Sequence, residues 1–77
     1  MYPSIKKANH PFDIGMMKII TAKGLKHRCV AEKAGYTVQE LSDMLNGRRL
    51  IKACDIPKLA GVLGVSPIDV YAAGEEV

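Results

Sequence analysis

Apolar residues recur along the chain at the spacing of amphipathic helices, and no segment alternates with the period of a strand. In the segment that begins at Phe12, the apolar stripe consists of Phe12, Met16, Ile19 and Ile20. The polar residues predicted to lie opposite that stripe are Asp13, Lys18 and Thr21. The whole pattern predicts five helices, at about residues 12–23, 27–34, 38–46, 54–63 and 67–73. The expected fold class is therefore all-α.

Residues that start and stop helices separate these segments. Thr37 and Glu40, three residues apart, form the pattern of a capping box. Ser66-Pro67 places an N-cap before a proline at the first helical position. Pro57 is tolerated only in the first turn of its helix. The expected stops are Gly24, Gly35, Asn46-Gly47, Gly64 and Gly74.

The chain of 77 residues predicts one domain. Residues 1–11, which contain Pro3 and Pro11, are expected to form a polar N-terminal arm. Residues 12–74 then form the helical domain, and residues 75–77 a short frayed tail.

The charge of the chain is basic and unevenly distributed. The formal net charge is +3, and all 11 Lys and Arg residues occur at or before Lys58. An anionic partner such as nucleic acid fits this distribution, although a charge of this size is also common for solubility alone. The absence of Trp, with one Phe and three Tyr, argues against stacking of single-stranded nucleic acid on aromatic side chains.

Candidate chemistry for an enzyme, a metal site or a cofactor is lacking in the sequence. Cys29 and Cys54 are interpreted as reduced thiols of a cytoplasmic protein. His27 and Cys29 form the one close His/Cys pair, and a zinc site needs a second cluster. No catalytic set, no cofactor motif and no membrane-spanning apolar run is present.

Residues 27–46 meet the local requirements of two helices that cross steeply over a tight turn. Ala31 is small where the second helix crosses, Gly35 accepts a positive φ, and Tyr36 fills the corner. The apolar anchors of the second helix are Leu41, Met44 and Leu45, and the seam is completed by Val30 and Ala34.

These motifs resemble the phage repressor and Cro family of helix-turn-helix proteins, also called XRE-type or lambda-repressor-like. The resemblance spans roughly residues 14–71, and it rests on Lys23-Gly24-Leu25, the Ala31 and Gly35 spacing, Leu-Asn-Gly-Arg at 45–48, and residues 59–66. It implies a compact five-helix domain whose helix-turn-helix is formed by the second and third helices.

The resemblance also implies a sequence-specific regulator of transcription that binds double-stranded DNA, of the phage or prophage repressor type. The helix from about residue 38 to 46 would lie in the major groove. The residues expected to contact bases are Thr37, Val38, Gln39, Ser42 and Asp43. Gln39 can pair bidentately with adenine. Asp43 could accept a hydrogen bond from cytosine N4, and it is equally well explained as a solvated surface charge. The residues expected to contact phosphates are His27, Arg28, Asn46, Arg48 and Arg49.

Two positions depart from the family pattern. Many members pair an Arg with a Glu where this chain has Ile20 and Leu45, so an apolar pair would replace a largely buried ion pair. Lys26 stands where a Ser or Asn cap is common, which weakens the start of the second helix.

Partners other than DNA stay open at this stage. The resemblance implies a homodimer on an operator with half-sites one helical turn apart. The alternative is a helix-turn-helix module that binds protein, or an antitoxin-like autoregulator that binds both, because fold does not dictate function.

Overall fold

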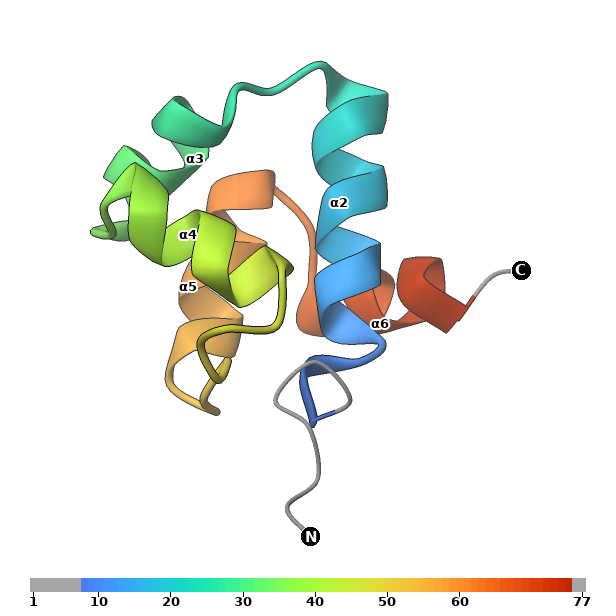
Figure 1. Cartoon of the computed structure of the whole chain (residues 1–77). Helices are drawn as coiled ribbons and strands as arrows, with labels where there is room; N and C mark the ends of the chain where they lie inside the picture. The colour runs from blue at the N-terminus through green and yellow to red at the C-terminus, as the bar shows by residue number, and fades with distance from the viewer. Residues whose placement is uncertain (1–7, 76–77) are drawn as a thin grey trace, which may run out of the picture.

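The computed structural model describes residues 8–75, in which five α-helices are joined by short loops and no strand occurs (Figure 1). The helices are α2 (Phe12–Lys23), α3 (His27–Ala34), α4 (Val38–Leu45), α5 (Asp55–Leu63) and α6 (Pro67–Glu75). The all-α, five-helix fold predicted from the sequence is thus confirmed.

Three helix ends differ from the predicted boundaries. Asn46 is the C-cap of α4 and Cys54 the N-cap of α5, so each helix is one residue shorter than expected. The third difference changes the interpretation of a residue, because α6 continues through Gly74 to Glu75. Gly74 was expected to end the helix and instead lies within it. Pro57 falls in the first turn of α5, as its missing N–H requires.

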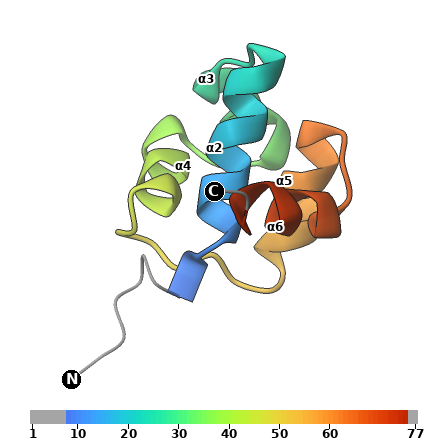
Figure 2. The same ribbon diagram turned by 90° about the vertical axis from the view of Figure 1, so that its right-hand side faces the viewer.

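The helices pack around one core, with α3 and α4 on one side of α2 and α6 on another (Figures 1 and 2). Eleven of the core residues are contributed by the helices α2, α3, α4 and α5: Phe12, Met16, Ile20, Val30, Ala31, Leu41, Met44, Leu45, Leu59, Ala60 and Leu63. The predicted apolar stripe of α2 is confirmed, with Ile19 half-buried at its edge.

Asp13 is buried, contrary to its predicted place on the polar side of α2. Only 1% of Asp13 is exposed. Its Oδ1 accepts a hydrogen bond from the Ile14 backbone N–H at 2.7 Å and lies 2.9 Å from His10 Nδ1. The sequence pattern allowed for one buried stripe, whereas α2 contacts α4, α5 and α6.

Two glycines permit α2 and α6 to approach more closely than side chains would allow. A Cβ atom added at Gly15 would lie 1.8 Å from the Val70 carbonyl oxygen. A Cβ atom added at Gly74 would lie 1.8 Å from the Pro11 carbonyl oxygen. Both obstacles are backbone atoms, which cannot turn aside as a flexible side chain can.

The end of the predicted N-terminal arm belongs to the folded domain. Asn9, which falls within the predicted arm, is only 2% exposed and therefore packs against the helical domain. Residues 1–7 of the predicted arm, and residues 76–77 of the predicted tail, lie outside the described residues.

We expect Gly15→Ala to destabilise the fold by about 3 kcal/mol, the upper part of the range for overpacked cores, because the added methyl group would force α2 and α6 apart. Gly61→Ala is the matched control, since a Cβ atom there meets nothing within 4 Å. It should be neutral or stabilise α5 by up to about 1 kcal/mol. Urea unfolding measures both; equal stabilities of the two variants would contradict the close approach.

Candidate functional site

The turn between α3 and α4 has the geometry that residues 27–46 predict. Gly35 adopts a left-handed conformation with φ of 86°, which a side chain would strain. The Tyr36 N–H donates to the Ala31 carbonyl at 2.8 Å, and Ala31 itself is fully buried. These contacts direct α4 across α3, as the sequence predicts.

Tyr36 connects this turn to the start of α5. Its hydroxyl donates a short hydrogen bond to Asp55, whose other oxygen accepts from the Lys52 backbone N–H at 2.9 Å. Burial, together with this bond and the adjacent carboxylate, raises the pKa of Tyr36 well above its ordinary value. Burial alone would raise the pKa of Asp55, but the hydrogen bonds from Tyr36 and Lys52 outweigh it and lower that pKa.

The first turn of α4 is closed by the predicted capping box. Thr37 Oγ1 accepts from the Glu40 N–H at 3.0 Å, and Glu40 Oε1 accepts from the Thr37 N–H at 2.8 Å. The second Glu40 oxygen lies 2.8 Å from an Arg49 guanidinium nitrogen. The backbone hydrogen bond from Thr37, with the charge of Arg49, lowers the pKa of Glu40.

Asp43 is the centre of the contacts on the outer face of α4. Its Oδ1 accepts from Gln39 Nε2 at 2.9 Å and lies 3.6 Å from Arg48 Nη1. Its backbone carbonyl accepts from the N–H groups of Arg48 and Arg49, at 2.8 and 3.1 Å. The turn that follows α4 is therefore folded back onto Asp43.

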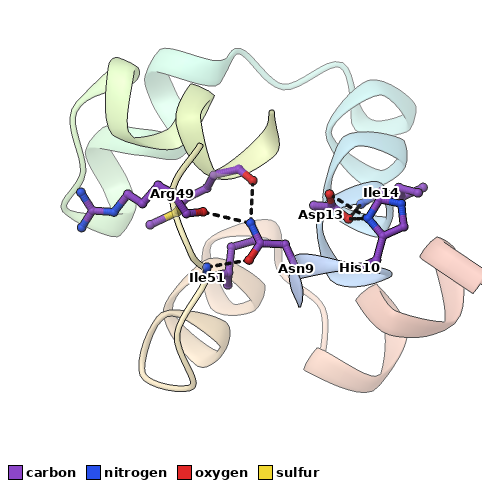
Figure 3. A network of polar contacts seen from close by, with 7 residues as sticks. Asn9, His10, Asp13, Ile14, Arg49 and Ile51 are labelled. Carbon is purple, nitrogen blue, oxygen red and sulfur yellow. Dashed lines mark hydrogen bonds and ion pairs between the residues drawn. The ribbon is translucent and has the colours of Figure 1, made fainter. Parts of the chain in front are cut away.

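The far end of α4 is held by Asn9, from outside the helix-turn-helix (Figure 3). Asn9 Nδ2 donates to the carbonyl oxygens of Met44, at 3.1 Å, and Arg49, at 2.9 Å. Asn9 Oδ1 accepts from the Ile51 N–H at 2.8 Å. One buried amide thus satisfies three backbone groups at the exit from α4, where each would cost about 1–3 kcal/mol if left unpaired.

A family model described as a helix-turn-helix domain matches residues 21–73. The chain belongs to this helix-turn-helix family. The restriction-modification controller protein C.AhdI from Aeromonas hydrophila has a similar crystal structure, with a TM-score of 0.73 and 26% sequence identity. The match covers 80% of this chain and 94% of that chain. No curated protein sequence matches the chain. The narrower resemblance to phage repressors stays a prediction.

All ten residues that the sequence assigns to DNA contact are exposed or half-buried, and none is in the core. Ser42 and Asp43 are half-buried, and the other eight are exposed: Thr37, Val38, Gln39, His27, Arg28, Asn46, Arg48 and Arg49. Hydrogen bonds and ion pairs join two small groups of them. One links Gln39, Asp43 and Arg48, and in the other Asn46 Nδ2 donates to Ser42 Oγ at 3.2 Å.

His27 and Arg28 do not take part in these contacts. They occupy the first turn of α3, and within residues 8–75 their side chains make no hydrogen bond or ion pair. Lys26, the N-cap, provides no side-chain hydrogen bond to that turn, as its identity predicts. The first backbone N–H groups of α3 therefore lack a side-chain cap.

Two residues that position α4 were missed by the sequence analysis. Asn9 had been assigned to an arm, and a single asparagine there gives no signal of burial. Asp55 offered a weak signal, since an acidic residue in a first helical turn is favourable, but nothing in the sequence connects it with Tyr36. By contrast, Ile20 and Leu45 are both buried, as expected for an apolar pair in place of an ion pair.

The described part of the chain gives little support to other kinds of site. Within residues 8–75, no three His, Cys, Asp or Glu side chains are grouped so as to hold a metal ion. Cys29 and Cys54 are exposed free thiols. None of the helices α2 to α6 is long and apolar enough to cross a bilayer.

We expect Tyr36→Phe to lower the free energy of unfolding by about 2 kcal/mol at pH 7, because a hydrogen bond to a charged acceptor is lost. The folded-state pKa of Asp55 lies below its ordinary value of 3.8, so this stabilisation is present above that pH and is lost as the pH falls. The difference in stability between variant and wild type should therefore shrink as the pH falls below 3.8.

Tyr71→Phe serves as the control in the same acid and urea titrations, because its ring packs on Phe12 and its hydroxyl has no hydrogen-bond partner within residues 8–75. Its stability should stay within about 0.5 kcal/mol of wild type at every pH. A difference between Tyr36→Phe and wild type that persisted undiminished at pH 2 would contradict the role of the Asp55 carboxylate.

Proposed function

We propose that the chain is a sequence-specific regulator of transcription that binds double-stranded DNA with the outer face of α4 in the major groove. The observation that carries this proposal is the way α4 is held. Its inner face is buried through Leu41, Met44 and Leu45, while Gln39, Ser42 and Asp43 remain accessible on the other side. A helix fixed in this way can present polar groups to base edges without reorganisation.

The proposed base contacts use groups that remain available. Val38 is 43% exposed, and its methyl groups suit contact with a thymine methyl group. Gln39 suits adenine, to which a carboxamide can both donate and accept. The Thr37 oxygen is already engaged by the Glu40 N–H. Its hydroxyl hydrogen and methyl group therefore remain for DNA.

The proposed phosphate contacts fall into two classes. His27 and Arg28 lack partners within residues 8–75, and the uncapped N-terminus of α3 beside them favours an anion. Arg48 and Arg49 are paired with Asp43 and Glu40, so a phosphate must compete with those carboxylates. Such exposed ion pairs are weak, typically below about 1 kcal/mol, so a phosphate can replace the carboxylate at little cost.

The proposed role in transcription rests on the similarity to C.AhdI, a restriction-modification controller protein. The phage or prophage repressor is a narrower form of the same proposal. We also propose that the chain binds its operator as a homodimer, with half-sites about 34 Å apart. The number of protein chains bound to each operator duplex tests this directly, and two chains are expected.

A protein-interaction module or an antitoxin-like autoregulator is the second candidate. One observation favours this candidate. The ion pairs of Arg48 with Asp43 and of Arg49 with Glu40 leave the outer surface of α4 and the turn after it with a net charge close to zero. Such a surface is less strongly attracted to DNA than an unpaired basic one.

The test begins by selecting a bound duplex from a random pool. The affinity of the protein for this duplex is then measured by titration at increasing salt concentrations. With Arg28, Arg48 and Arg49 on phosphates, each protomer should lose about 40-fold in affinity between 50 and 200 mM salt. Arg28→Ala should lower the salt slope by about one. Gln39→Ala should instead reduce discrimination at a single base pair, by about 1–3 kcal/mol. Absence of binding to any duplex at low salt would favour the protein-interaction module.

A further inference from the structure

Asp43 is an acidic side chain in the centre of the surface proposed to meet DNA. A carboxylate there repels the phosphates of every duplex, so the proposed function alone does not explain its place. The sequence left open whether Asp43 contacts a base or is merely solvated. Its contacts with Gln39 and Arg48 indicate a third role.

The hydrogen bond from Gln39 to Asp43 fixes the orientation of the Gln39 amide. A carboxylate only accepts hydrogen bonds, so the Gln39 nitrogen, and not its oxygen, must point toward Asp43. The two residues are four apart on α4, the spacing at which helical side chains meet. The Gln39 oxygen and its second amide hydrogen are then left, and these are the acceptor and the donor that adenine requires.

The charge of Asp43 acts separately from its hydrogen bond. Its side chain is 29% exposed and that of Arg48 is 69% exposed, with 3.6 Å between the charged atoms. A pair this open and this long contributes little to stability. It does cancel one positive charge beside the proposed DNA surface, and this lowers the attraction for phosphates of any sequence.

We propose that Asp43 is a specificity-determining positioning residue. It orients the Gln39 amide for the recognition of adenine, and its negative charge lowers the affinity for all duplexes alike. This proposal rests on the proposed function, because it assumes that the outer face of α4 meets DNA.

Two substitutions separate these effects. Asp43→Asn keeps an oxygen that accepts from Gln39 and removes the charge, whereas Asp43→Ala removes both. Glu75→Gln, which loses the same charge on α6, is the control, since α6 packs on α2 away from α4 (Figure 2). Each protein is titrated with the selected duplex, its single-base-pair variants and a shuffled duplex, at one salt concentration.

Both substitutions should strengthen binding to the shuffled duplex, by about threefold to tenfold for one charge near two phosphates. Asp43→Ala should also lose at least about fivefold in discrimination at the base pair that Gln39→Ala affects, part of the range for one bidentate contact. Asp43→Asn should keep most of that discrimination. In Gln39→Ala/Asp43→Ala, discrimination at this base pair should fall no further than in Gln39→Ala. Glu75→Gln should bind as wild type does.

Three results would overturn the proposal. The first is unchanged discrimination in Asp43→Ala, and the second is equal loss in Asp43→Asn and Asp43→Ala. The third is weaker binding of the shuffled duplex by both variants. If wild type binds the selected duplex and any of these is seen, only the role of Asp43 fails. If wild type binds no duplex, the proposed function fails first.

Discussion

The orientation of α4 depends on one buried side chain, the amide of Asn9. Asn9 lies before α2 in sequence, yet it bonds to Met44 at the end of α4 and to Arg49 and Ile51 in the segment that follows. The Met44 carbonyl lies in the last turn of α4, where a helix leaves its carbonyl groups unpaired, and the other two groups lie beyond the helix. Regular structure therefore satisfies none of the three. An amide, with two donor hydrogens and an acceptor oxygen, matches this set. The segment before α2 and the exit from α4 are thereby joined.

The beginning of α4 is fixed by a different polar contact. Tyr36 precedes the N-cap Thr37, and its hydroxyl is bound to Asp55 at the start of α5. With Asn9 at the other end and the apolar anchors along the inner face, α4 is restrained along its whole length. The outer face can then carry polar groups that are not needed to anchor α4 on the core. This division between a fixed inner face and an available outer face is the physical basis of the proposed DNA recognition.

The parts of the fold that depend on residues near in sequence were predictable. The capping box, the left-handed Gly35 and the buried pair Ile20 and Leu45 each follow from local pattern or family resemblance, and the structure contains them. The missed features depend on contacts between residues far apart. Asp13 is buried because α2 has several neighbours, and Gly74 lies inside α6 where that helix meets Pro11. A one-dimensional pattern carries no information about such approaches.

The central claim is that the outer face of α4 meets the bases of a DNA duplex. It is tested most directly by nuclear magnetic resonance of labelled protein with the selected duplex. The account predicts large shifts for the Gln39 side-chain amide and for the backbone amides of residues 38–43, together with those of the first turn of α3. A duplex that binds while the Gln39 side-chain amide and these backbone amides remain unshifted would show that another surface holds the DNA, and would contradict the account.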